Sequence, residues 1–190
     1  DPTGVNDSSA AFQAACDHGE FVYIPAGRYQ INSTINLNYI NKMFGDGVNT
    51  TMIEFDDSLP YLFNCAGRHT FSNFSVITNA GDNYAFYNDD HTGLTFNNVW
   101  LIGGSFSATE VKTKYLYCVG NNWVNIVMEN VLCDCGIYDN GFAFYFVSDG
   151  LHDSNDLVFQ NCFIDTVMAT GSVNVGAVYM EKCRNAHINN

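Results

Sequence analysis

The chain has 190 residues, which fits one domain and is long enough to bury a substantial core. Hydrophobic residues make up 47% of it, which excludes a disordered chain. The formal net charge of −13 makes contact with a phosphate backbone unfavourable, so we expect no nucleic-acid partner. We also expect no membrane insertion, because no apolar run approaches the ~18 residues of a membrane span.

The seven cysteines are odd in number and too sparse for a disulfide framework. Cys133 and Cys135 lie two residues apart, which is not the spacing of zinc ligands. We interpret most of the cysteines as small buried apolar residues. This predicts folding in a reducing cytoplasm, with no metal and no other cofactor.

Residues 1–20 predict a cap at one end of the fold. A polar loop leads into a short helix that Asp7 or Ser8 can cap, and Gly19 ends this helix. The strand signals begin directly afterwards. FVYIPAGRYQI predicts two strands around a Pro-Ala-Gly turn, and MFGDGVNTTMIEF predicts a further turn and strand.

From residue 69 onward, one short pattern recurs around an asparagine. The five copies are HTFSNFSV around Asn73, LTFNNVWL around Asn98, IVMENVLC around Asn130, LVFQNCFI around Asn161, and AHINN ending at Asn190. Their spacing of 25 to 32 residues is typical of solenoid coils with variable loops. We therefore predict that residues 21–190 form the coils of a right-handed, single-stranded parallel β-helix, an all-β fold with a short N-terminal capping helix.

The apolar alternation shifts by one residue at each asparagine. Before it, apolar residues stand two and four positions away, as Phe96 and Leu94 do; after it, they stand one and three positions away, as Val99 and Leu101 do. Such a shift indicates a corner at which the chain keeps its apolar side inward. We expect the asparagine amides to lie inside the bend and to bond the backbone of neighbouring coils. The alternative is that asparagine merely marks turns.

A second strand precedes each asparagine copy. The five strands are YLFN at 61–64, YAFY at 84–87, YLYC at 115–118, FAFY at 142–145 and AVYM at 177–180. They are apolar or aromatic on both faces, although a solenoid wall has only one inner face. Something else must cover the outer face, and we predict a homotrimer packed along it.

The opening residues resemble the start of the pectate-lyase-like superfamily of right-handed β-helices, which includes phage tailspikes, capsule depolymerases and some fungal glucanases. The matching residues are Asp1, Thr3, Gly4, Asp7, Pro25, Gly27, Tyr29, Gly45, Asp46, Gly47 and Ile53. We assign them structural roles. The resemblance implies a polysaccharide partner, and the charge of the chain favours a neutral glycan over an anionic one.

Members of this superfamily that cleave glycans present carboxylates on the outer surface of successive coils. Asp134 and Asp165 each follow a repeat asparagine by four residues, so we expect them to stack roughly 5 Å apart on adjacent coils. That spacing suits the paired carboxyl groups of a glycoside hydrolase. Glu129 is a third candidate on the neighbouring strand. The alternative is that these residues are solvated turn positions.

Three further residues are candidates for substrate binding: Trp100, Phe163 and Glu181. Trp100 and Phe163 stand two residues after an asparagine on the outer face, where aromatic rings bind sugars or contact another subunit. Both alternatives remain open. Glu181 closes a strand one coil further on.

We therefore expect a tailspike-type protein of a phage, located in the virion tail or outside the cell after folding in the bacterial cytoplasm. It would bind a bacterial surface polysaccharide and hydrolyse it. The alternatives are a non-catalytic trimeric fibre or adhesin module, and a free secreted glycanase or polysaccharide lyase. Because the chain stops within its fifth asparagine copy, we also expect a fragment of a longer protein.

Overall fold

The computed structural model describes residues 1–38, 41–56, 58–78, 84–89, 93–107, 112–120, 126–138, 141–148, 157–168, 176–181 and 186–189. Only the backbone is described at positions 78, 89, 104–107, 112–120, 134–138, 141–143, 145, 147–148, 164–168, 176–177, 179 and 181.

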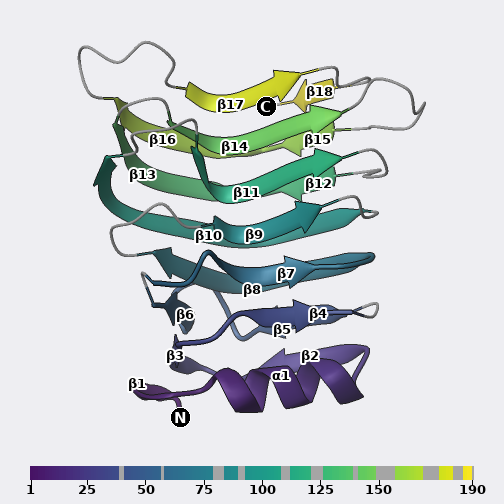
Figure 1. Cartoon of the computed structure of the whole chain (residues 1–190), viewed down its shortest axis with the longest axis vertical. Coiled ribbons are helices and arrows are strands. Elements are labelled where there is room, and N and C mark those ends of the chain that lie inside the picture. The colour runs from purple at the N-terminus through teal and green to yellow at the C-terminus, as the bar shows by residue number, and fades with distance from the viewer. Residues whose placement is uncertain are drawn as a thin grey trace.

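The described residues form a parallel β-solenoid with one helix at its N-terminal end (Figure 1). The first elements are β1 (Thr3–Asp7), α1 (Ser9–His18), β2 (Phe21–Ile24), β3 (Gly27–Ile31), β4 (Ile35–Leu37), β5 (Lys42–Gly45) and β6 (Thr51–Phe55). The middle strands are β7 (Tyr61–Cys65), β8 (His69–Thr78), β9 (Tyr84–Asp89), β10 (Leu94–Ser107), β11 (Lys112–Gly120) and β12 (Ile126–Glu129). The last strands are β13 (Leu132–Tyr138), β14 (Gly141–Ser148), β15 (Leu157–Gln160), β16 (Phe163–Met168), β17 (Gly176–Glu181) and β18 (Ala186–Asn189).

Two sheets form the walls of the solenoid. The corner sheet has 12 strands, with β1-β3-β6-β8-β10-β12-β15-β18 as its main path and β2, β5, β13 and β16 joined to it. The second sheet has 6 strands in the order β17-β14-β11-β9-β7-β4. Strands from successive coils lie side by side, and every pairing among the described strands is parallel. The predicted all-β parallel β-helix with a short N-terminal helix is confirmed.

Hydrogen bonds of the opening signature shape the cap and the first coil. The Asp1 carboxylate accepts bonds from the backbone and side chain of both Thr3 and Asn6, which closes the first loop. The Asp46 carboxylate accepts bonds from the Tyr23 hydroxyl and the Ala26 N–H, each at 2.7 Å. These contacts are consistent with the structural roles that we expected for the signature.

Glycine is required at one signature position for steric reasons. A Cβ on Gly45 would overlap the Asn73 carbonyl oxygen and would lie 2.8 Å from Thr51 Cβ. The first coil and the first asparagine corner therefore pack directly against each other at a point that only glycine allows.

The corners lie where the sequence places them, but the asparagine side chains are not inside the bend. Asn73, Asn98, Asn130 and Asn161 have φ between 49° and 58°, the left-handed region that asparagine tolerates better than most residues. This conformation directs the side chains outward, while residues two positions before and one position after an asparagine, such as Phe71 and Phe74 around Asn73, are buried. The side chains of Asn73, Asn130 and Asn161 are exposed, and that of Asn98 is half-buried. Asn190 lies outside the described residues.

The amides of successive corners also bond to each other. Asn98 Nδ2 donates to Asn73 Oδ1 at 2.9 Å, and Asn161 Nδ2 donates to Asn130 Oδ1 at 3.4 Å. Asparagine therefore marks the turn, as in the alternative interpretation, and it adds an amide ladder on the outer surface.

The interior is a stack of aromatic and aliphatic side chains. Phe71 is fully buried, and its ring centroid lies 4.7 to 5.7 Å from those of Phe63, Phe86 and Phe96. These rings come from both sheets, so the two walls share one core. Cys16, Cys65 and Cys133 are buried and Cys162 is half-buried, which agrees with their interpretation as small core residues.

Candidate functional site

The outer surface of the corner sheet carries a polar row beside the asparagine corner. Its members pair in register on successive strands, and together we call them the polar row: Ser72, Asn97, Glu129, Gln160 and Asn189. Because neighbouring strands lie about 4.8 Å apart, consecutive members of the row are one such step from each other.

Glu129 is the charged member of this row. Its Oε2 accepts a hydrogen bond of 2.9 Å from Asn97 Nδ2, and both side chains are half-buried. The bond orients the carboxylate without neutralising it. Of the predicted catalytic residues, Glu129 is the one whose side chain the structure describes.

A second row runs along the other side of the corner, where Met52, Ser75, Trp100, Leu132 and Phe163 pair in register. Ser75 stands two residues after Asn73, the position that the sequence places on the outer face for Trp100 and Phe163, but it is fully buried. Its hydroxyl donates a bond to the Val48 carbonyl of the turn that covers it. Trp100 is half-buried and Phe163 is 62% exposed. Among the members of this row, Phe163 is the exposed one.

Asp134 and Asp165 are partners in the backbone register of β13 and β16. Ile102 precedes them at the same position of β10, and the neighbouring Cys133 is buried. Since successive residues alternate between the faces of a strand, positions 134 and 165 belong to the outer face. Their side chains lie outside the described residues.

Glu181 does not belong to this face. It pairs with Val147 in the second sheet, whereas Trp100 and Phe163 are in the corner sheet. In the sequence, Glu181 directly follows AVYM at 177–180, and this strand is in the second sheet. Its side chain also lies outside the described residues.

The outer face of the second sheet carries stacked tyrosines. The Tyr61 and Tyr87 rings lie 4.8 Å apart at 12°, and Tyr84 lies 6.3 Å from Tyr87. All three are half-buried. In the backbone register, Tyr87 is followed by Tyr117, Tyr145 and Tyr179 on successive strands, so tyrosine recurs at one position along this wall.

Sequence reasoning missed a cluster of exposed aromatic residues near the N-terminal end. Phe21 and Tyr23 on β2 and Phe44 on β5 are exposed, and the Tyr23 and Phe44 rings lie 5.3 Å apart. The signal was present, because FVYI is apolar on both faces and one face of a solenoid strand must point outward. We call these three residues the aromatic cluster.

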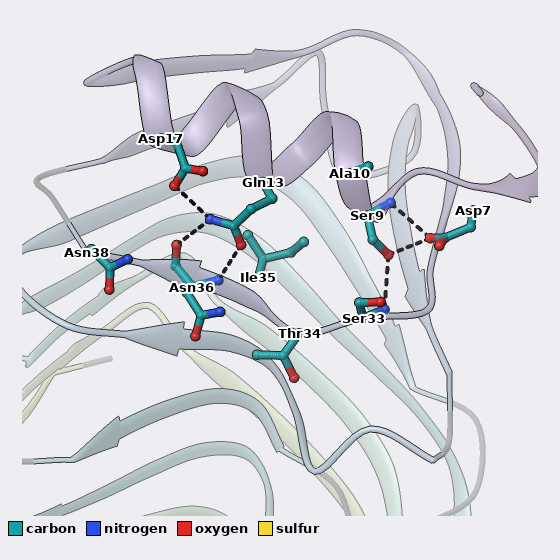
Figure 2. Close-up of a pocket in the computed structure, with 10 residues that line it drawn as sticks. All are labelled: Asp7, Ser9, Ala10, Gln13, Asp17, Ser33, Thr34, Ile35, Asn36 and Asn38. Carbon is teal, nitrogen blue, oxygen red and sulfur yellow. Dashed lines mark hydrogen bonds between the residues drawn. The ribbon is translucent and has the colours of Figure 1, made fainter.

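An open pocket of about 520 Å³ lies between α1 and β4 (Figure 2). Gln13 bridges it: its Oε1 accepts a bond of 2.8 Å from the Asn36 N–H, and its Nε2 donates a bond of 3.0 Å to the Asn36 carbonyl oxygen. Ser9 Oγ accepts bonds from the N–H groups of Asn32 and Ser33. These side chains occupy the place of a neighbouring strand at the edge of the second sheet, so the pocket is a seam of the cap.

A carboxylate at the helix N-terminus completes this seam. Asp7 Oδ1 accepts bonds from the N–H and hydroxyl of Ser9, whereas the Ser8 side chain makes no capping bond. The bonds from Ser9 lower the pKa of the Asp7 carboxyl, with a smaller contribution from the Asn32 N–H.

Within the described part of the chain, no three His, Cys, Asp or Glu side chains lie together as a metal site would require. In that same part, no helix is long and apolar enough to cross a membrane.

A profile of the family "rhamnogalacturonase A/epimerase, pectate lyase-like" matches residues 1–190. The chain belongs to this family. The resemblance inferred from the opening signature and the repeat is thereby confirmed. The search of curated proteins gave no match.

Similar solved structures include the A-module of the mannuronan C-5 epimerase AlgE4 of Azotobacter vinelandii, at 13% identity and a TM-score of 0.50, covering 95% of this chain and 74% of that one. ORF18 of Geobacillus virus E2 has 13% identity and a TM-score of 0.41, with 100% and 59% coverage. A candidate glycosyl hydrolase of Parabacteroides merdae ATCC 43184 has 12% identity and a TM-score of 0.40, with 95% and 90% coverage. At such identities, the similarity to the epimerase module shows the fold alone.

Proposed function

We propose that this protein is a phage tailspike-type protein that binds and cleaves a bacterial surface polysaccharide, acting from the virion tail or as an extracellular protein. Membership in the family supports a polysaccharide substrate. The opening signature, with its resemblance to tailspikes and capsule depolymerases, supports the phage context.

The observation that carries the proposal is the register pairing of Asp134 and Asp165 on adjacent coils. Strands about 4.8 Å apart bring such a pair close to the ~5–5.5 Å separation of the carboxyl groups in retaining glycosidases. One aspartate would protonate the glycosidic oxygen, and the other would attack the anomeric carbon, so that a glycosyl ester forms as the alcohol leaves. Water, deprotonated by the first aspartate, would then cleave this ester and release the sugar. Two carboxylates at this distance favour sharing one proton, which suits an acid and its partner.

The neighbouring described residues fit this role. Phe163 lies two positions before Asp165 on β16, and its exposed ring can contact the apolar face of a sugar. Glu129 precedes the corner on the adjoining strand β12 and is held by Asn97. A glycan that binds across the corner would contact both Phe163 and Glu129.

The test measures oligosaccharide release from a panel of bacterial surface polysaccharides by the wild-type protein and by Asp134→Asn and Asp165→Asn. Removing an acid or base group is expected to lower the rate by about 10²–10⁴-fold. Asp17→Asn, which removes an exposed carboxylate of α1, is the matched control and should keep the wild-type rate.

Full activity in both aspartate variants would show that neither Asp134 nor Asp165 is catalytic. Binding without release by the wild-type protein would favour the non-catalytic fibre or adhesin. An unsaturated uronate product, detected by its ultraviolet absorbance, would show that the protein is a lyase and not a hydrolase.

We also propose that the second sheet forms the contact of a homotrimer. Tyr61, Tyr84 and Tyr87 support this, because stacked half-buried tyrosines on an outer wall are typical of protein interfaces. Sedimentation should give three times the monomer mass, and Tyr87→Ser should lower the association constant. A stable monomer at all concentrations would refute the trimer.

A further inference from the structure

The aromatic cluster presents three rings that are already fixed in place. Phe21 is 63% exposed, Tyr23 53% and Phe44 36%. The Tyr23 hydroxyl donates to Asp46 at 2.7 Å, and Lys42 Nζ lies 5.0 Å from the centre of the Phe21 ring. Rings held in this way lose little conformational entropy when a ligand binds.

The cluster stands at the start of the polar row. Tyr23 pairs with Phe44, and Phe44 pairs with Ser72, which is the first member of that row. A parallel line leads from Phe21 through Lys42 and Thr70 to Thr95. From β2 to Glu129 on β12, the surface extends over four strand steps, or about 19 Å.

The side chains along this surface change from aromatic to polar. Beyond Phe44, half-buried Thr70, Ser72 and Thr95 offer hydroxyl groups, and Asn97 offers an amide. A pyranose ring has an apolar C–H face and a rim of hydroxyl groups. Aromatic rings match the first, and hydroxyl and amide groups match the second.

We propose that the aromatic cluster is a binding site for a neutral glycan, and that the glycan continues from it along the polar row toward Glu129. The proposal rests on the proposed function in taking a glycan as the partner. It adds a binding site outside the aspartate pair, and it gives the chain direction of the glycan as parallel to the solenoid axis.

The size and charge of the surface favour this occupant. Aromatic side chains of ~150–250 Å² at these exposures offer about 300 Å² together, well below the roughly 1,000 Å² of a specific protein interface. Lys42 and Asp46 flank the rings with opposite charges, while the whole chain has a net charge of −13. An anionic polymer would therefore be repelled, and a neutral one would not.

The test is affinity electrophoresis of the full chain in native gels that contain dextran, xyloglucan, galactomannan or a neutral bacterial O-polysaccharide, with alginate and polygalacturonate as anionic probes. The variant is Phe21→Ala/Phe44→Ala. Val5→Ala is the matched control, because Val5 is 80% exposed on β1 and lies outside both lines. Circular dichroism and thermal unfolding verify that each variant keeps the fold.

We expect at least one neutral polysaccharide to retard the wild-type protein, with affinity about tenfold or more weaker in the double variant and unchanged in Val5→Ala. The proposal is overturned if no neutral probe retards the protein, if the double variant binds equally well, or if the anionic probes bind more tightly. It is also overturned if sedimentation shows that the double variant loses an association between copies while glycan binding is unchanged.

The two proposals fail separately. Asp134→Asn/Asp165→Asn is expected to bind the neutral polysaccharide like the wild-type protein while releasing no product. Binding without any cleavage by the wild-type protein would refute the proposed hydrolysis and support the glycan site. Cleavage with unchanged retardation in Phe21→Ala/Phe44→Ala would refute the glycan site and leave the hydrolysis standing.

Discussion

The opening coils and the later coils form the same architecture with different chemistry. In the opening coils, from β2 to β6, individual side-chain contacts hold the turn after β5: Asp46 bonds to Tyr23 and Ala26, and Gly45 leaves room for the Asn73 backbone. The later coils repeat one device, an asparagine with positive φ. At the edge strand β4, Gln13 of α1 bonds to the Asn36 backbone in place of a missing strand, whereas the strands of an inner coil have neighbours on both sides.

The largest expected effect concerns the core that both regions share. Phe71→Ala should lower the free energy of unfolding by about 3–5 kcal/mol, because it opens a cavity among rings from both walls. Denaturant unfolding measures this loss. Phe163→Ala, on the exposed face, should stay within about 0.5 kcal/mol, and equal losses in the two variants would show that the core is not what unites the coils.

The next effect concerns the close packing at Gly45 in the opening coils. Gly45→Ala should cost about 1–3 kcal/mol, because the new Cβ meets backbone that cannot move aside easily. Gly19→Ala is the matched control, since its Cβ would meet nothing closer than 3.3 Å. Unfolding midpoints compare the two, and a harmless Gly45→Ala would remove the steric distinction between the opening coils and the others.

A smaller effect tests the repeated corner. Asn98→Ala should cost about 1–2 kcal/mol, because alanine is strained at φ 51°. Asn98→Gly keeps this conformation without strain and loses only the bond to Asn73, so its cost should be below about 1 kcal/mol. If glycine costs as much as alanine, the amide ladder and not the backbone conformation stabilises the corner.

The smallest effect tests the cap through pH. The folded pKa of Asp7 is lowered from its unfolded value of 3.8, chiefly by the Ser9 hydroxyl. Its contribution is therefore present above pH 3.8 and is lost as the pH falls through the lower folded value. Asp7→Asn should remove that part of the acid dependence of the unfolding midpoint. If the unfolding midpoint of the variant falls with decreasing pH as it does in the wild-type protein, the helix cap does not depend on this carboxylate.

The sequence alone determined the repeat and everything that follows from its period. Aligning copies on Asn98, Asn130 and Asn161 predicts which residues share a register position, and it places Asp134 opposite Asp165 as the backbone does. Alternation is a local property of the chain, so it is readable without knowing what lies nearby. The second strand of each coil was located in the same way, and all five belong to the second sheet.

Only the tertiary structure decided which side chains are covered and in which direction the corner side chains point. Ser75 follows the outward pattern but is buried, because a turn more than twenty residues earlier in the chain lies over it. The asparagine amides point outward because the sign of φ at a corner sets the direction of the side chain, and an apolar pattern does not contain that sign.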